Sequence, residues 1–294
     1  LGANGCVAIA KALNVNNSVV FLGIAMNNIL EEGCAAIAEA LRVNRALTEC
    51  NLKDNKLGSK GWSAIFDALR ENKDNKISKW DLFSQGINPT IAKSLAAYIA
   101  VSGSLRSIDA CWNNIGKEGT AAIADALKVN NSLTSLDIRL NRLGPEGSMA
   151  LGEALKVNCI LTSLDVGGNS IGKEAALKLV NILQEKQMIS VGLEGCNLGA
   201  DGAKIVADYI RVSSSLASLS LAANDIGDEG ATSITGALMA NGLLKWLELN
   251  YNAITTKGAV AFAELLKVNR SLTSLSLEGN RIGKKGGMAI AEAL

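Results

Sequence analysis

The chain has 294 residues, of which 48% are apolar and 19% are charged, and its formal net charge is +1. A charge so close to zero provides no bulk attraction to nucleic acid or to an anionic membrane surface. The sequence has no histidine, so it lacks the commonest general base and the commonest metal ligand. No apolar run approaches the roughly 18 residues of a membrane-spanning helix.

A repeated strand–turn–helix pattern runs through the chain. Residues 1–13 contain a glycine turn and an alanine-rich helix, which form an incomplete first repeat. Within each later repeat, alternating apolar residues predict a short strand, and small or apolar residues at helical spacing predict a helix. These repeats follow one another about every 28 residues and begin at Val19, Leu47, Ile77, Leu105, Leu133, Leu161, Met188, Leu216, Leu244 and Leu272.

The repeats predict an α/β solenoid of ten strands and eleven helices in one domain that covers residues 1–294. Because a helix is wider than the roughly 4.8 Å between strands, the stack must curve. A parallel sheet would then line the concave face, and helices would cover the convex face. The chain starts and stops within a repeat, so we expect a fragment of a longer protein whose cut ends associate end to end.

An asparagine ends nearly every strand, which predicts a ladder of buried amides that bond to backbone groups left free there. Small residues such as Gly119 and Ala126 are expected to let the helices approach the sheet closely. Asn158 is expected to end its helix in a left-handed conformation. The ladder members are Asn27, Asn55, Asn113, Asn141, Asn169, Asn224, Asn252 and Asn280.

Two repeats depart from the pattern. Gln85 and Cys196 replace the ladder asparagine, residues 71–76 lengthen the repeat before Gln85, and Asn88 with Pro89 replaces a glycine turn. We expect a local irregularity at one or both places. It represents either tolerated drift or a repeat adapted to a partner.

The six cysteines form no CxxC pair. Cys6, Cys34 and Cys50 fall at core positions, which is typical of small buried hydrophobes in a reducing, intracellular compartment such as the cytoplasm. The N-x-S sequences at Asn16, Asn130 and Asn269 share one repeat phase, so repetition explains them better than glycosylation does.

The pattern LxxLxLxxNxIGxxG followed by AxAIAxALKVN resembles the ribonuclease-inhibitor-like class of leucine-rich repeats. It is most similar to the repeat regions of NLR-type receptors, which are nucleotide-binding immune receptors. The resemblance covers essentially the whole chain and implies a horseshoe whose strand-lined concave face binds macromolecules. Nearly identical segments such as ALKVNNSLTSLD and LLKVNRSLTSLS also fit recent duplication or a consensus-derived design.

Strand residues that do not enter the core should face the concave surface, where they contribute nine acidic and three basic side chains. The resulting net charge of −6 favours a basic protein surface and disfavours nucleic acid. Aspartates on four consecutive strands form a ladder that either binds a cationic partner or bonds to neighbouring serines after duplication. Exposed aromatic and apolar side chains are candidate anchors. The candidate partner-binding residues are Asp81, Phe83, Asp109, Cys111, Trp112, Asp137, Arg139, Leu140, Asp165, Glu194, Trp246, Glu248, Asn250 and Tyr251.

We therefore predict a non-enzymatic scaffold that binds a basic protein through its concave face, without a cofactor, a metal ion, nucleic acid or a membrane. No nucleophile accompanies the aspartates, and an open face does not exclude water, so catalysis or calcium binding there is poorly supported. Three alternatives stay open. They are the sensor region of a larger NLR-type receptor, a designed or consensus-like repeat protein, and a GTPase-activating protein of the same repeat class.

Overall fold

The computed structural model describes residues 1–294, in which eleven helices alternate with ten strands. The helices are α1 (Gly2–Val15), α2 (Leu30–Val43), α3 (Gly58–Glu71), α4 (Pro89–Val101), α5 (Gly116–Val129), α6 (Gly144–Val157), α7 (Lys173–Leu183), α8 (Gly199–Val212), α9 (Gly227–Ala240), α10 (Thr256–Val268) and α11 (Gly283–Ala293). The strands are β1 (Phe21–Gly23), β2 (Glu49–Asn51), β3 (Lys79–Asp81), β4 (Ser107–Asp109), β5 (Ser135–Asp137), β6 (Ser163–Asp165), β7 (Ser190–Gly192), β8 (Ser218–Ser220), β9 (Trp246–Glu248) and β10 (Ser274–Ser276).

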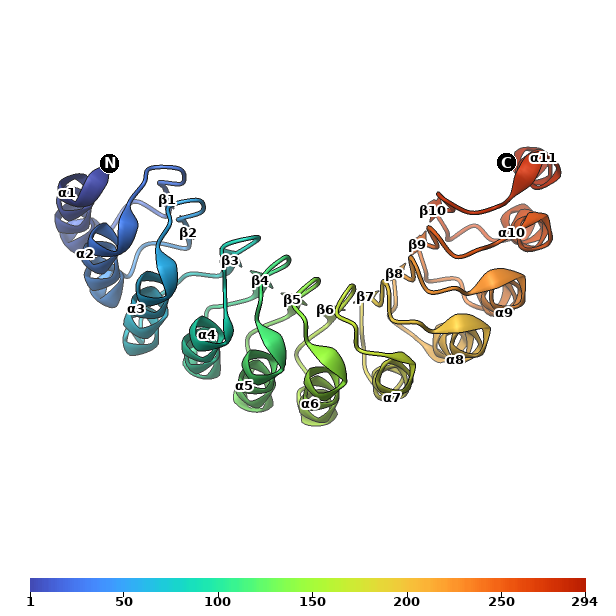
Figure 1. Cartoon of the computed structure of the whole chain (residues 1–294), viewed down its shortest axis with the longest axis horizontal. Coiled ribbons are helices and arrows are strands. Elements are labelled where there is room, and N and C mark those ends of the chain that lie inside the picture. The colour runs from blue at the N-terminus through green and yellow to red at the C-terminus, as the bar shows by residue number, and fades with distance from the viewer. The chain divides into compact units, whose positions relative to one another are not determined.

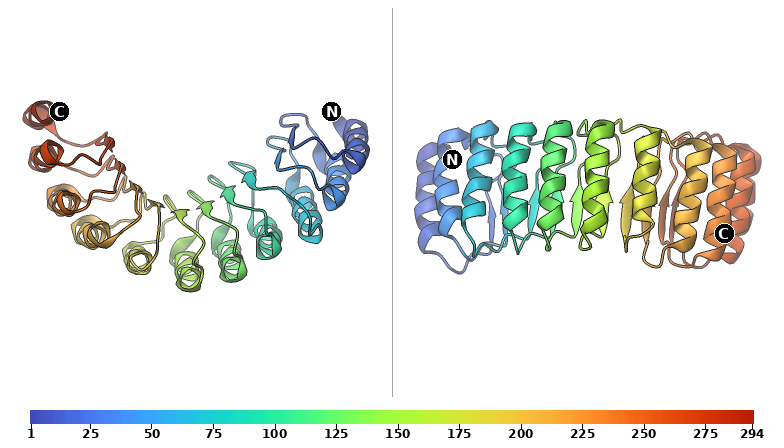
Figure 2. Two further views of the ribbon diagram at one scale, coloured as in Figure 1. Left: turned by 180° about the vertical axis from the view of Figure 1, so that it is seen from behind. Right: turned by 90° about the horizontal axis from the view of Figure 1, so that it is seen from below.

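The chain forms two compact units. Unit 1 consists of Leu1–Leu143 with Glu153–Leu161, and unit 2 consists of Gly144–Gly152 with Thr162–Leu294. Strands β1 to β5 of unit 1 are parallel and ordered as in the chain, and so are β6 to β10 of unit 2. Within each unit the helices lie side by side along one face of the sheet and leave the other face open (Figure 1; Figure 2). The predicted strand–helix repeat is confirmed, whereas the assignment of residues 1–294 to one domain stays a prediction.

The core of each repeat lies between its strand and its helix. In unit 1, Leu136 within β5, Ile138 directly after it and Ile123 of α5 are at most 1% exposed. Gly119 lies against the neighbouring helix, because an added Cβ would be 2.8 Å from the Cβ of Ala92 in α4. This small residue therefore serves helix–helix contact, which corrects the expectation that it serves contact with the sheet.

A buried aromatic cluster fills the core around the lengthened repeat of unit 1. Trp62 and Phe66 of α3, Trp80 of β3 and Tyr98 of α4 pack with ring centroids 5.7 to 6.5 Å apart. The hydroxyl of Tyr98 donates to Oδ1 of Asn75 at 3.1 Å, within the inserted residues. The insertion is thus anchored by large side chains that helical spacing alone did not single out.

The predicted asparagine ladder is present, and Asn224 of unit 2 shows how it works. Its side-chain Nδ2 donates to three backbone carbonyls at 2.7 to 3.1 Å, those of Leu193, Leu221 and Ala222. Its Oδ1 accepts hydrogen bonds from two backbone N–H groups, those of Cys196 and Leu198. Asn224 is fully buried, so these backbone groups have no access to water as an alternative partner.

A second asparagine ladder follows the helices, and the sequence analysis did not predict it. In unit 1, Nδ2 of Asn158 donates to the carbonyls of Leu127 and Asn130, and its Oδ1 accepts from the N–H groups of Ile160 and Leu161. Asn158 has φ −76° and ψ 123°, so the expected left-handed helix end was wrong. Equivalent amides bond in the same way at Asn44, Asn72, Asn130, Asn241 and Asn269.

The repeat that contains Gln85 is irregular, as predicted. Its Nε2 donates to the carbonyl of Phe83 at 3.0 Å and to Oδ1 of Asp54 at 3.2 Å, and its Oε1 accepts from the N–H of Asp54 at 2.8 Å. The longer side chain is therefore directed to the preceding turn. Strands β2 and β3 pair through Glu49 and Lys79, whereas β3 and β4 pair along their whole length.

Asp228 of α9 caps the next helix, α10, where threonine replaces the usual glycine turn. Its Oδ1 accepts from the N–H groups of Thr255 and Gly258, both at 2.8 Å, and its Oδ2 accepts from the Thr255 hydroxyl at 2.6 Å. Burial raises the pKa of this carboxyl, but these hydrogen bonds and the charge of Lys257 lower the pKa further, to below its ordinary value of 3.8. The charged carboxylate thus stabilises the start of α10.

We expect Asp228→Asn to lower the melting temperature near neutral pH, with a difference that disappears in acid. Because the folded-state pKa is depressed, the stabilisation is present above about pH 4 and is lost as pH falls through the folded-state pKa. Thermal melts of both proteins between about pH 6 and about pH 2 measure the difference. Asp225→Asn, in the exposed turn before α9, is the control and should change little. A gap that persists unchanged in acid would contradict a contribution from the charge.

Cys6, Cys34 and Cys50 are buried, as predicted, and so are Cys111 and Cys196, while Cys159 is exposed. Burial raises the pKa of the Cys34, Cys50 and Cys196 thiols to about 12. The thiolate is the reactive species, so these groups are both shielded and protonated.

We expect a thiol reagent such as Ellman's reagent to label one of the six cysteines in the folded protein, and that one to be Cys159. All six should react in denaturant. Rapid labelling of a Cys159→Ser variant without denaturant would show that a core cysteine is accessible.

Candidate partner-binding surface

The turn after each strand places one residue in the left-handed region of backbone conformation. At this position φ is 54° to 59° for Met26, Asp54, Ser84, Trp112, Leu140, Ala223 and Tyr251, and glycine occupies it at residues 168, 195 and 279. A non-glycine residue costs roughly 1 kcal/mol or more in this region, and bulky side chains are rare there. The conformation lets neighbouring turns bond, since the N–H of Trp112 donates to the carbonyl of Arg139 at 3.0 Å.

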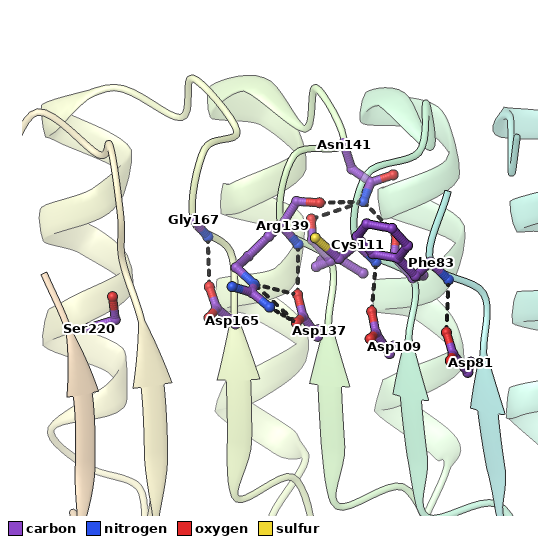
Figure 3. A network of polar contacts seen from close by, with 12 residues as sticks. Asp81, Phe83, Asp109, Cys111, Asp137, Arg139, Asn141, Asp165, Gly167 and Ser220 are labelled. Carbon is purple, nitrogen blue, oxygen red and sulfur yellow. Dashed lines mark hydrogen bonds and ion pairs between the residues drawn. The ribbon is translucent and has the colours of Figure 1, made fainter. Parts of the chain in front are cut away.

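The aspartates of the predicted ladder stabilise these turns. In each, Oδ1 accepts a hydrogen bond from the backbone N–H two residues further on, at 2.9 to 3.2 Å (Figure 3). The pairs are Asp81 with Phe83, Asp109 with Cys111, Asp137 with Arg139, and Asp165 with Gly167. This is the turn chemistry for which aspartate is favoured. The aspartates therefore have a structural role within their own turns, in place of the serine contacts considered from the sequence.

Three apolar side chains are exposed at the ends of consecutive strands in unit 1. Phe83, Trp112 and Leu140 are 42%, 60% and 43% exposed, and they follow β3, β4 and β5, which pair in that order. We call these three residues the apolar anchors. Cys111, which the sequence analysis placed on this surface, is 5% exposed and belongs to the core, so it is not accessible to a partner.

Basic residues of the chain neutralise two aspartates of unit 1. Nζ of Lys53 lies 3.0 Å from both carboxylate oxygens of Asp81 and 5.3 Å from the ring centroid of Phe83. Arg139 bonds to Asp137, with Nη2 at 2.6 Å from Oδ2. The aspartate ladder of unit 1 is therefore less attractive to an external cation than its sequence indicated.

The remaining candidates lie in unit 2. Tyr251 is 61% exposed, and Trp246 is half-buried in β9. The carboxylate of Glu248 accepts hydrogen bonds from Oγ of Ser220 and Nδ2 of Asn250, both at 2.8 Å. Glu194 is exposed, and the Asp165 carboxylate covers the place where Gly192 would carry a side chain, since an added Cβ would lie 2.0 Å from its Cγ.

No group of three or more His, Cys, Asp or Glu side chains is arranged as the ligands of a metal ion would be. None of the eleven helices is both long and apolar enough to span a membrane. The open sheet face presents exposed apolar and charged side chains, among them Trp112, Tyr251 and Glu194.

Five segments of the chain match a family model described as a leucine-rich repeat: residues 129–152, 157–180, 212–234, 241–263 and 268–291. No curated protein matches the chain by sequence. The solved structure of the yeast Rad7 and Elc1 complex contains a chain that is similar over 99% of this chain and 80% of its own length, with 14% identity and a TM-score of 0.55. At that identity the similarity concerns the fold alone.

Two further solved structures have lower TM-scores. The tropomodulin C-terminal domain of Caenorhabditis elegans matches 62% of this chain and 91% of its own, with 17% identity and a TM-score of 0.38. Actin-binding site 2 of leiomodin-1 matches 49% of this chain and 84% of its own, with 19% identity and a TM-score of 0.45. The five matched segments coincide with strand–helix repeats of the structure, and the ten repeats have the fold of a leucine-rich repeat solenoid.

Proposed function

We propose that this chain is a non-enzymatic scaffold that binds a protein partner through the strand ends of unit 1. The observation that carries the proposal is the exposure of the three apolar anchors on adjacent strands. Clustered exposed aromatic and apolar side chains are typical of interface hot spots. The solved structure that is similar over most of this chain is that of a complex of two proteins, Rad7 and Elc1.

The backbone at two of the anchors supports a binding role. Trp112 and Leu140 hold φ at 59° and 55°, where glycine would be more stable. The conformation itself belongs to the repeat, since all ten turns share it. What supports a binding role is that bulky side chains stand at these two positions in place of glycine. Both side chains are largely exposed, so packing in the core does not explain why these two positions carry large apolar residues.

The finer predictions from the sequence are retained as hypotheses. They are a partner with a basic surface, an intracellular location, and a kinship with the sensor repeats of NLR-type receptors. End-to-end self-association also stays a prediction, which sedimentation velocity at several concentrations would test.

Affinity capture from a lysate of the source organism tests the proposed function. One bait is the native chain, and the other carries Phe83→Ala, Trp112→Gly and Leu140→Gly. We expect at least one protein that the native bait captures directly to be reduced about tenfold or more on the variant. Equal capture by both baits, whose melting temperatures are first shown to agree, would contradict binding through the apolar anchors.

A further inference from the structure

The strand face of unit 2 carries acidic side chains and no basic ones. Its inward-facing strand and turn positions have a net charge of −4, from Asp165, Glu194, Glu248 and Glu278. The same positions of unit 1 have a net charge of −2, from five acidic and three basic residues: Glu49, Asp54, Asp81, Asp109, Asp137, Lys53, Lys79 and Arg139. Most of the net negative charge predicted for the concave surface, −4 of −6, therefore belongs to unit 2.

The three glutamates of this face form no ion pair with the chain's own lysines or arginines. Glu248 is held by neutral partners, Ser220 and Asn250. Glu278 accepts a hydrogen bond from the hydroxyl of Tyr251 at 3.3 Å. By contrast, Lys53 and Arg139 pair with two of the four aspartates on this face of unit 1, Asp81 and Asp137. An external cation would thus find glutamates in unit 2 that pair with no basic residue of the chain, whereas in unit 1 the chain's own basic residues already pair with Asp81 and Asp137.

An exposed aromatic side chain accompanies the glutamates. The ring of Tyr251 lies over Gly279. An added Cβ at residue 279 would be 2.3 Å from the ring, so only glycine leaves room for the ring there. Tyr251 is nevertheless 61% exposed, and Trp246 is half-buried in β9, the strand that the Tyr251 turn follows. An aromatic face beside carboxylates attracts lysine and arginine side chains through cation–π and ionic contacts.

Unit 1 contains an example of this recognition within the chain. Lys53 lies over the ring of Phe83 while its Nζ bonds to Asp81. At the position that corresponds to Lys53, the repeat before Glu248 has Ala222, which is too short to reach the carboxylate. The combination of aromatic ring and carboxylate is thus filled by the chain's own lysine in unit 1 and left for another molecule in unit 2.

We propose that the strand face of unit 2 binds a basic peptide segment of the partner protein, which places lysine or arginine side chains against Tyr251 and between Glu194, Glu248 and Glu278. The proposal rests on the proposed function, because its occupant is a protein. Gly195, in the turn beside Glu194, has no side chain and leaves open space for a peptide backbone. An added Cβ there would meet nothing nearer than Gly168, at 3.8 Å. The complementary charge selects a basic segment over an acidic one.

The test measures binding of a short fluorescein-labelled peptide that alternates lysine and serine, by anisotropy at low salt. We expect the native chain to bind it and the Glu248→Gln, Glu278→Gln double variant to bind about tenfold or more weakly. Tyr251→Ala should also weaken binding, because it removes the aromatic face. The affinity should fall between about 50 mM and about 200 mM salt, and the peptide with glutamate in place of lysine should not bind.

A matched control removes the same charge from the helix side of unit 2. Asp208→Asn with Glu264→Gln replaces two exposed carboxylates that pair with Arg211 and Lys267. This control should bind the peptide as the native chain does. Equal loss in the control and in the Glu248, Glu278 variant would show general charge attraction and overturn the proposal, as would a native chain that does not bind.

The outcome is separable from that of the proposed function. The variant with all three apolar anchors replaced keeps the strand face of unit 2, so it should retain affinity for the lysine peptide. If that variant still captures the partner and still binds the peptide, the proposed function fails while the basic-segment site stands. If the anchor variant loses the partner and the native chain does not bind the peptide, the proposed function stands and the basic-segment site fails.

Discussion

The Trp112→Gly variant is expected to lose partner binding without losing stability. The side chain is 60% exposed, so its removal sacrifices little core packing. Glycine also relieves the left-handed backbone at φ 59°, a gain of roughly 1 kcal/mol that offsets the lost contacts. Truncation of a central aromatic residue in an interface costs about 2 kcal/mol or more, which corresponds to a loss in affinity of more than about tenfold.

The measurement combines urea unfolding with titration of the partner identified by affinity capture. Ala223→Gly is the matched control, because Ala223 has φ 54° at the same position of the turn and carries almost no side chain. Ala223→Gly should raise stability slightly, through the same relief of the backbone conformation, and leave partner affinity unaltered. A Trp112→Gly protein that is destabilised by several kcal/mol would show that the indole is a structural group, contrary to our interpretation.

The Asn224→Ala variant is expected to lose about 4 kcal/mol of unfolding free energy. Alanine leaves the carbonyl of Leu193 and the N–H groups of Cys196 and Leu198 buried without a partner. The carbonyls of Leu221 and Ala222 each lose one of two hydrogen bonds, because Asn252 and the N–H of Gly195 also donate to them. Each buried unsatisfied group costs about 1 to 3 kcal/mol, although relaxation recovers part of the sum. Guanidinium or urea unfolding measures the loss.

The chain provides its own reciprocal test of the ladder. Cys196 replaces an asparagine in the preceding repeat, and its Sγ contacts the carbonyl of Glu194 at 3.6 Å. Cys196→Asn should therefore raise the unfolding free energy by about 1 kcal/mol, as the new amide satisfies backbone carbonyls. Asn131→Ala, on an exposed loop residue, should stay within about 0.5 kcal/mol of the native chain. Equal effects at Asn131 and Asn224 would contradict the ladder as the source of stability.

Periodicity in the sequence predicted the helices and strands because the spacing of apolar residues determines which face of an element is buried. The positions of Leu136, Ile138 and Ile123 follow from alternation in a strand and from helical spacing, and all three are buried. The first asparagine ladder was also predictable, since Asn224 and its equivalents recur where strands end. The second ladder had an equal signal in the repeated Val-Asn that includes Asn158, but that signal was interpreted as a helix end.

The surface was less predictable because it depends on turn conformation and on contacts between repeats. Trp112 and Leu140 adopt a left-handed backbone that their residue types avoid. The one indication in the sequence is that glycine takes the same position at Gly168, Gly195 and Gly279. The pairing of Lys53 with Asp81 joins residues 28 positions apart, and no local pattern indicates which charges neutralise each other.

Site-specific photo-crosslinking tests the central claim most directly. A benzoylphenylalanine is introduced in place of Leu140, at the strand ends of unit 1, or in place of Val129, at the C-terminal end of α5 on the helix side. Both residues are exposed, at 43% and 67%, so either position tolerates the reagent. We expect a partner protein to be crosslinked from position 140 and not from position 129. A partner that is crosslinked from position 129 alone would contradict recognition through the strand ends and place it on the helices.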